Sequence, residues 1–224
     1  MTHTKRHLLL ALLLTLSSLL NAQNSSIEVG TRGGNNATFG NFGALSLVAQ
    51  HNFADNFTLK GGFLSTTYER FSAEVRPSYH HKLPFGTLHF EALLHYTDQS
   101  NMGNFALGGG VGIRTNRLWA KVGYYHRTLQ SGGERLAEPF NLYYEFGVNL
   151  LPSRPDWDLM VVLSNSHFLD LERHYIPSLT VDGWWYPSQK WGIRLGAHYT
   201  PTGVFFISSD YYQLLANIGV CYRW

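Results

Sequence analysis

The sequence predicts an all-β fold class: a membrane-spanning, antiparallel, up-and-down β-barrel of twelve strands, with ten strands as the fallback. Three observations favour this fold. Apolar and polar residues alternate along many segments of about ten residues. The apolar faces of these segments tend to begin or end in aromatic rings. Beyond residue 22 no run of about 18 apolar residues offers a membrane-spanning helix.

The first residues have the features of a removable export signal. Lys5 and Arg6 precede a mainly apolar, leucine-rich run at residues 8–20, and Asn21-Ala22 offers a small residue for cleavage. A run of this length is shorter than the roughly 20 residues that a membrane helix needs. We therefore expect a signal peptide at residues 1–22 and a β-barrel domain at residues 23–224.

Charge and cysteine content exclude several classes of function. The chain has 17 basic and 15 acidic residues, and removal of residues 1–22 takes away Lys5 and Arg6, which leaves 15 of each sign. A neutral chain without a basic surface is not expected to bind nucleic acid. Cys221 is the only cysteine, so no disulfide can form within the chain. No cofactor is expected.

Segment 191–199 shows the alternation most clearly. Its odd positions are Trp, Ile, Leu, Ala and Tyr, and its even positions are Gly, Arg, Gly and His. Because a strand directs neighbouring side chains to opposite faces, this segment has one apolar and one polar surface. The same pattern occurs at residues 71–79 and 87–97. A soluble β-sandwich also alternates, so a second observation is needed to separate the two folds.

Aromatic residues provide that observation. In a membrane barrel the apolar face contacts lipid, and aromatic rings form a belt at each membrane interface. The predicted belts consist of Phe57, Tyr79, Trp157, Trp185, Trp191 and Trp224 at one end, and of Phe71, Tyr96, Tyr124, Tyr144, Tyr175 and Tyr199 at the other.

The expected strands are long enough to cross a membrane. A strand of about 11 residues that rises about 3.3 Å per residue and tilts by about 40° spans roughly 28 Å, close to the ~25 Å apolar band of such barrels. The first strand is short, and residues 33–50 alternate least, which is the reason for the ten-strand fallback. The strands are expected at residues 25–32, 38–50, 56–67, 69–81, 86–97, 103–114, 118–128, 139–150, 157–167, 173–186, 190–200 and 211–224.

Connections on one side are expected to be longer than those on the other, as extracellular loops are longer than periplasmic turns. The outer connections include loops at residues 33–36, 98–103, 130–138, 168–173 and 201–210. Several of them are acidic.

The last six residues resemble the terminal strand signal of bacterial outer-membrane β-barrel proteins. Trp224 and Tyr222, two residues earlier, fall on the apolar face, and Gly219 begins the segment. The sequence departs from this signal in one respect, because its last residue is Trp where Phe is usual. The resemblance implies integral location in the outer membrane, a surrounding lipid bilayer, and recognition of this strand by the barrel-assembly machinery during biogenesis. It covers the signal, the strand pattern and the terminus, but it is generic and names no activity.

The opposite face of the strands carries charges that are expected in the lumen, nine of them basic and six acidic. Charges in such an enclosure must pair or be hydrated. A packed salt-bridge network predicts a closed lumen, whereas hydrated charges predict a narrow pore with a slight preference for anions. The lumen charges are Glu28, Arg32, Lys60, Arg70, Glu74, Arg76, Glu91, Arg114, Lys121, Arg127, Glu145, Asp158, Asp182, Arg194 and Arg223.

We therefore expect a non-catalytic, porin-like barrel that forms a narrow channel for small anionic solutes. The alternative is a structural barrel with a closed lumen or one that binds an unidentified surface partner. A barrel-embedded lipid hydrolase is a distant alternative, because such enzymes use a serine activated by histidine and no His-x-Ser motif is present. Ser164 and His167 would lie on opposite faces of a regular strand.

Histidines raise one further alternative. His95, His174 and His198 are expected to face inward near the outer rim, where imidazoles can hold a transition metal. Histidines in hydrogen-bonded polar networks are the commoner arrangement. No catalytic or metal-ligating residue is therefore predicted.

Overall fold

The computed structural model describes residues 25–38, 40–99, 102–171, 177–201 and 211–224, so the predicted signal peptide lies outside the described residues. The described chain forms β1 (Ser25–Asn36), β2 (Gly40–Ala54), β3 (Phe57–Thr66), β4 (Arg70–Leu83), β5 (Gly86–Gln99), β6 (Met102–Arg114), β7 (Leu118–Ser131), β8 (Glu134–Asn149), β9 (Trp157–Ser164), β10 (Ser178–Trp185), β11 (Trp191–Pro201) and β12 (Tyr211–Arg223).

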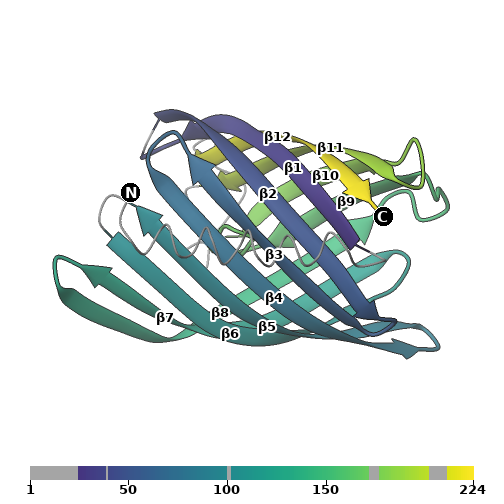
Figure 1. The fold of residues 1–224 in the computed structure, drawn as a ribbon, viewed down its shortest axis with the longest axis horizontal. Coiled ribbons are helices and arrows are strands. Elements are labelled where there is room, and N and C mark those ends of the chain that lie inside the picture. The colour runs from purple at the N-terminus through teal and green to yellow at the C-terminus, as the bar shows by residue number, and fades with distance from the viewer. Residues whose placement is uncertain (1–24, 39, 100–101, 172–176, 202–210) are drawn as a thin grey trace.

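The sheet closes on itself. Each strand pairs antiparallel with the next one in the sequence, and β1 also pairs with β12 (Figure 1). Short connections favour this order, because antiparallel neighbours need only a tight turn. The predicted twelve-stranded barrel is confirmed, and the ten-strand fallback is wrong.

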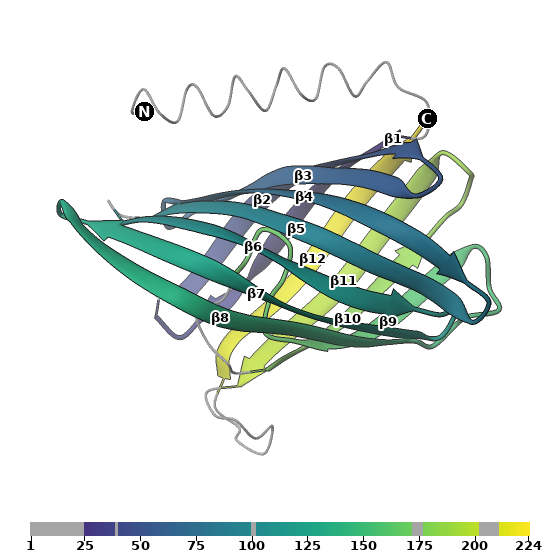
Figure 2. The same cartoon turned by 90° about the horizontal axis from the view of Figure 1, so that it is seen from below.

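The two ends of the barrel differ in what they contain. Backbone hydrogen bonds join Ser25 to Trp224 in both directions, at 3.1 and 3.0 Å, so the start of β1 and the C-terminus lie together. We call this the inner end, and the opposite one the outer end. In Figure 2 the β7–β8 hairpin extends far along the outer end, whereas β9 and β10 are shorter.

Three predicted outer loops are wrong because the strands continue into them. In the loop predicted at residues 98–103, β5 runs to Gln99 and β6 begins at Met102. β1 includes residues 33–36, and its pairing with β2 runs to Asn36–Gly40. Residues 130–138 form the end of a hairpin whose turn is Gly132-Gly133, with φ of 58° and 90°. Glycine adopts this left-handed conformation readily, and two-residue hairpin turns require it. The charged residues around this turn resemble a loop because the hairpin extends into water.

Two strands are shorter than predicted. β9 ends at Ser164 instead of residue 167, and β10 begins at Ser178 instead of residue 173. The chain between them therefore leaves the barrel wall three residues earlier than the sequence suggests. This departure positions the candidate site described below.

The outside of the barrel is apolar. Leu45, Leu94, Leu107, Val122 and Leu195 are each between 41% and 61% exposed, although a soluble sandwich would bury such residues. The contact with lipid accounts for this exterior. Among the described residues, no helix is long and apolar enough to cross a membrane.

The register brings several of the predicted belt aromatics side by side. At the inner end Phe57 is opposite Tyr79, Trp157 is opposite Trp185, and Trp191 packs against Tyr222. Nearer the outer end, Tyr96 is opposite Phe105, and Tyr124 stacks on Phe140. The belt residue Tyr175 lies outside the described residues. Of the other belt positions, Phe71 stacks on Phe63, Tyr144 contacts Phe146, Tyr199 is opposite Leu214, and Trp224 stacks on Tyr222.

An arginine substitution on the outside of the barrel wall tests whether that surface contacts hydrocarbon. Val122 is 45% exposed and lies within β7, four residues beyond Leu118. Leu118 is the first residue of that strand. We expect Val122→Arg to lower the free energy of unfolding by about 2–4 kcal/mol in lipid vesicles and Leu118→Arg by about 0–1 kcal/mol, because the cost depends on depth. Urea unfolding followed by tryptophan fluorescence measures both. Equal, small losses would contradict the membrane-facing assignment.

Candidate functional site: a narrowed lumen

The lumen contains three cavities that follow one another along the barrel. A cavity of about 650 Å³ opens at the outer end, and one of about 1040 Å³ opens at the inner end. Between them lies a middle cavity of about 110 Å³. The middle cavity shares Asp170 with the outer cavity, and it shares Glu28 and Lys60 with the inner one. The lumen is therefore wide at both ends and narrow in the middle.

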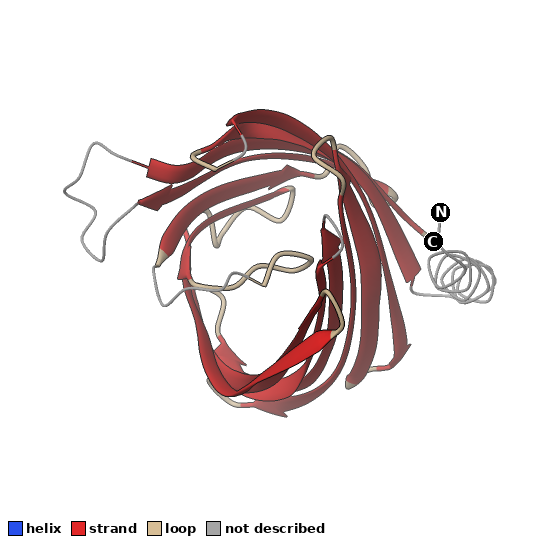
Figure 3. Cartoon of the chain, turned by 90° about the vertical axis from the view of Figure 1, so that its left-hand side faces the viewer, coloured by secondary structure: helices blue, strands red, loops and turns tan. Residues whose placement is uncertain are grey.

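The constriction is formed by the chain that follows β9. Residues 165–171, which we call the inward segment, turn into the lumen instead of continuing the wall, and Figure 3 shows this loop inside the ring of strands. The sequence placed residues 168–173 in an outer loop, and for residues 168–171 this prediction is wrong. Leu169 is fully buried, and Asp170 and Leu171 are nearly so. A polar surface loop would have no reason to bury two leucines.

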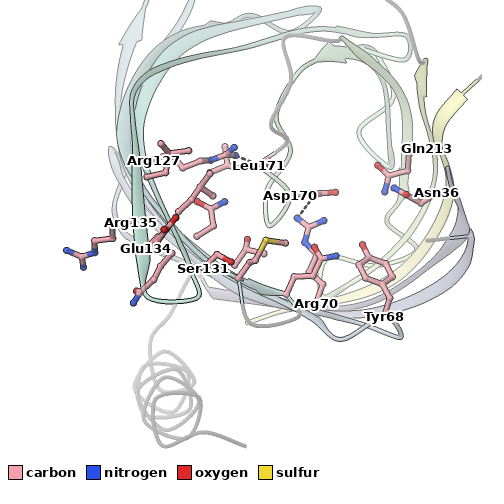
Figure 4. A pocket seen from close by; sticks show the side chains of 17 residues that line it. Asn36, Tyr68, Arg70, Arg127, Ser131, Glu134, Arg135, Asp170, Leu171 and Gln213 are labelled. Atoms are coloured by element: carbon pink, nitrogen blue, oxygen red, sulfur yellow. Dashed lines mark hydrogen bonds and ion pairs between the residues drawn. The ribbon is translucent and has the colours of Figure 1, made fainter. Parts of the chain in front are cut away.

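Three wall residues from two strands, β4 and β7, hold the inward segment. Arg70 of β4 contacts the Asp170 carboxylate at 2.5 Å, and Glu74 accepts a 2.8 Å hydrogen bond from the Leu169 amide. Arg127 of β7 donates to the carbonyl of Leu171 at 3.2 Å. Figure 4 shows Asp170 and Leu171 extending across the outer cavity toward Arg70 and Arg127.

The centre of the inward segment is strained. Leu169 has a φ of 69°, a left-handed conformation that costs a residue with a Cβ about 1–2 kcal/mol. Its side chain packs with Val48 and Leu64 in a small apolar cluster, with Phe168 at the edge. Backbone strain of this kind persists only where surrounding contacts impose it, and it occurs frequently at binding sites.

Two ionisable residues of the inward segment have shifted pKa values. Burial raises the pKa of Asp170, but Arg70 and Arg32 outweigh burial and hold that pKa below its usual range, so the carboxylate stays charged. Burial lowers the pKa of His167 to about 4, so the imidazole is neutral at pH 7. Neutral His167 lies 2.7 Å from the Ser178 hydroxyl, and its ring contacts that of His198.

One side of the lumen is filled by an ion-pair network. Arg76 bonds to Glu74 and lies 3.5 Å from Glu91, and Lys121 reaches Glu91 at 3.2 Å and Glu145 at 3.3 Å. These residues come from β4, β5, β7 and β8. The network closes this side to solvent, as the packed-lumen alternative predicts.

Tyr143 completes the filled side. Its ring is 1% exposed, and its hydroxyl donates to Glu91 at 3.0 Å. The ring lies directly against Gly110 and Gly123, where an added Cβ would come within 2.3 Å of it. Glycine at these two positions is therefore what allows the ring to lie against the wall.

The other side of the lumen keeps the middle cavity and is lined by cations. Arg194 is paired with Glu28 at 2.9 Å and with Asp182 at 2.7 Å. Arg32 and Lys60 form no ion pair with any residue that the structure describes. The Lys60 ammonium lies 4.3 Å from the centre of the Phe168 ring. A solute that passes the constriction therefore meets two cations without a paired carboxylate.

All fifteen predicted lumen charges are placed by these contacts. Each lines one of the three cavities or pairs with another of the fifteen. The remaining members are Arg114, which lies 3.6 Å from Asp158, and Arg223, which lines the inner cavity. The structure thus combines the two arrangements that the sequence left open, a packed network and a charged cavity.

The serine and histidine pair is closer than the sequence suggests. Because β9 ends at Ser164, His167 turns back and its Nε2 atom lies 3.3 Å from the Ser164 hydroxyl. Ser164 and Ser178 are both fully buried, so neither hydroxyl faces one of the three cavities. This arrangement stabilises the start of the inward segment and offers no accessible nucleophile.

The histidines of the metal alternative do not meet. His95 bonds to Glu74 and Thr97, and His198 bonds to Thr180 and Thr200. His174 lies outside the described residues. Within the described ranges, no group of three or more His, Cys, Asp or Glu side chains could hold a metal ion.

Sequence reasoning missed the inward segment and the aromatic lining of the inner cavity. Trp184 and Tyr186 line that cavity, although the sequence singled out only their outward neighbour Trp185. The period of two assigns Trp184 to the lumen, so strand parity could have found it. No local pattern marks residues 168–171 as inward.

Comparison with solved structures places this fold among outer-membrane barrels. The KdgM porin in complex with disordered oligogalacturonate matches with a TM-score of 0.60 and 15% identity, covering 89% of this chain and 99% of that one. The NanC porin matches with a TM-score of 0.58 and 13% identity, covering 89% and 100%. The translocator domain of autotransporter NalP from Neisseria meningitidis matches with a TM-score of 0.55 and 14% identity, covering 94% of each chain.

No family model matches the sequence, and no curated protein matches it either. The similarity at these identities establishes the fold, which porins and a translocator domain share. The chain therefore has the closed β-barrel fold that outer-membrane porins also have, with an apolar exterior.

Proposed function

We propose that the protein is a narrow, non-catalytic channel that passes small anionic solutes across the outer membrane. The observation that supports this function is the succession of outer, middle and inner cavities, which share lining residues where they meet. Solutes would pass between the inward segment and the wall formed by β1, β3 and β11. The filled side of the lumen would take no part in conduction.

The charges along this route support a preference for anions. Arg32 and Lys60 are the cations without a paired carboxylate among the described residues of the middle cavity, and Arg194 lies between the two acids Glu28 and Asp182. Basic side chains that line a constriction favour anions over cations. The porins among the structural neighbours, one of them solved with an acidic oligosaccharide, are consistent with this proposal.

Reversal of the two unpaired cations tests the proposed selectivity. In planar lipid bilayers under a salt gradient, we expect the wild-type protein to give conductance steps and a reversal potential that indicates anion preference. Arg32→Glu combined with Lys60→Glu should move the reversal potential to the cation side, because each change replaces a positive charge at the constriction by a negative one.

The matched control is Arg154→Glu. Arg154 is exposed at the inner end and forms a weak pair with Asp156 at 3.6 Å. Replacing its positive charge by a negative one should therefore leave the ion selectivity unchanged. Folded wild-type protein that gives no conductance steps would overturn the channel function. Selectivity that shifts equally in the control would show that the middle cavity does not determine it.

A closed structural barrel is the second candidate. The buried network of Arg76, Glu91, Lys121 and Glu145 supports it, because a fully paired lumen needs no water. The same bilayer recording separates the two candidates. We favour the channel because the network occupies one side of the lumen and leaves the middle and inner cavities on the other.

The C-terminal strand and the first 22 residues have proposed roles in export and assembly. We infer that Gly219, Tyr222 and Trp224 at the end of β12 carry the signal for the barrel-assembly machinery, and that residues 1–22 direct export. β12 is also the strand that closes the barrel against β1. An unidentified surface partner at the outer end remains part of the proposal.

A further inference from the structure

The inner cavity has an aromatic surface that conduction alone does not explain. Trp184 and Tyr186 line it, and because they are two residues apart they project from the same face of the chain. Their rings are parallel, at an angle of 4°, with centroids 6.0 Å apart. An added Cβ at Gly192 would lie 2.8 Å from the Tyr186 ring, so the absence of a side chain there lets that ring lie against the wall.

Polar groups surround these rings, and Gln50 and Asn52 among them bond to each other at 3.4 Å. The indole N–H of Trp184 has no hydrogen-bond partner among the described residues. The side chains of Gln50, Asn52 and Gln189 line the same cavity. A cavity of about 1040 Å³ exceeds what single ions need and reaches the upper size of sites for organic ligands.

The charge of the inner cavity favours an acidic ligand. Its lining includes four cations, Lys60, Arg114, Lys190 and Arg223, against the two acids Glu28 and Asp55. Glu28 is already paired with Arg194 at 2.9 Å, and Arg114 lies 3.6 Å from Asp158. This leaves Lys60, Lys190 and Arg223 as the cations of the cavity without a paired carboxylate among the described residues. The guanidinium of Arg223 lies 4.0 Å from the centre of the Tyr186 ring, which places a cation directly beside the aromatic surface.

These features match the chemistry of a sugar acid. A pyranose ring has a face of C–H groups that packs on the electron-rich face of an aromatic ring, and a rim of hydroxyls that needs planar amide partners. A carboxylate on the same sugar would pair with a guanidinium. We infer that the inner cavity is a binding site for a saccharide that carries a carboxylate, with Trp184 as the stacking surface and Arg223 as the carboxylate partner.

This site would give the proposed channel a substrate class, so the inference rests on the proposed function. The arrangement also separates sugar acids from other anions. A simple inorganic anion would gain nothing from the aromatic surface, and an aromatic acid would offer no hydroxyl to the indole N–H of Trp184. The site therefore selects for a ring with a hydroxylated rim and a negative charge.

Adjacent tryptophans supply a matched pair of variants. Trp184 lines the inner cavity, whereas Trp185 is 41% exposed on the outer face and stacks on Trp157. The full chain, folded in detergent, is titrated calorimetrically with a trisaccharide of galacturonic acid, with the neutral trisaccharide maltotriose and with benzoate. We expect saturable binding of the acidic trisaccharide, weaker binding of maltotriose and none of benzoate.

Trp184→Leu should weaken binding of the acidic trisaccharide by roughly 3- to 10-fold. Trp185→Leu should leave the affinity for this trisaccharide unchanged. Arg223→Gln should lower the affinity for the acidic trisaccharide to that for maltotriose. The affinity for maltotriose itself should not change. Heat-modifiable gel migration verifies that each variant is folded. Equal loss in both tryptophan variants, or benzoate binding as tight as the trisaccharide, would overturn the inference.

The two proposals fail in different ways. Wild-type protein that conducts ions but gives no saturable heat with the acidic trisaccharide would remove the saccharide site and leave the channel. Protein that gives no conductance but binds the trisaccharide through Trp184 would remove the channel and retain the site.

Discussion

Asp170→Ala is expected to widen the lumen. Asp170 is the only carboxylate within 4 Å of the Arg70 guanidinium among the described residues, at 2.5 Å, and both side chains are largely buried. Loss of one partner from a buried pair costs about 3–5 kcal/mol, because the other charge remains buried without compensation. An energy of this size weakens docking of the inward segment by roughly 150- to 4,000-fold.

The expected result is passage of larger solutes. In liposome-swelling measurements with uncharged polyethylene glycols of graded size, the variant should admit polymers that the wild-type protein excludes. Uncharged probes are needed, because removal of a carboxylate would also raise anion conductance through electrostatics alone. Single-channel conductance should rise in parallel, toward that of a lumen without the inward segment.

Asp156→Ala is the matched control for this variant. Asp156 also pairs with an arginine, but at 3.6 Å and in an exposed turn, where such a pair contributes about 0–1 kcal/mol. It should leave the size limit unchanged. An unchanged size limit in Asp170→Ala, in protein verified to be folded, would show that the inward segment does not restrict the lumen.

Strand parity explains why so much of the fold could be predicted from the sequence. A side-chain period of two assigns Glu74 and Arg76 to one face and Val75 to the other, whatever the register. The register itself and the exact strand ends are tertiary properties. At Gly132-Gly133 the strands continue beyond the membrane into water, where polarity no longer distinguishes strand from loop.

The inward segment could not be predicted for a different reason. Its position depends on partners distant in the sequence, such as Glu74 for the Leu169 amide, 95 residues away. A Leu with positive φ has no local signature, because it occurs only where tertiary contacts impose it. Strand parity predicted the charges of the lumen, whereas the narrow passage between them depends on a loop of seven residues.

The second large effect is expected at Glu74, where the ion-pair network and the inward segment meet. Glu74 is 1% exposed; it bonds to Arg76, lies 2.9 Å from His95 and accepts the Leu169 amide at 2.8 Å. Glu74→Ala leaves Arg76, within the described part of the chain, with only the Glu91 carboxylate at 3.5 Å as an ion-pair partner. We expect the free energy of unfolding to fall by about 3–5 kcal/mol, measured by urea unfolding in lipid vesicles.

The control and a double variant separate the two roles of Glu74. Asp158→Ala breaks the more exposed pair with Arg114 at 3.6 Å and should cost about 0–1 kcal/mol. Glu74→Leu combined with Arg76→Met replaces the buried pair by apolar side chains, which should recover most of the lost stability. It cannot restore the acceptor for the Leu169 amide, so the double variant should remain permeable to larger solutes. A double variant that regains both stability and the wild-type size limit would show that Glu74 acts through charge alone, and that the inward segment is held by Arg70 and Arg127.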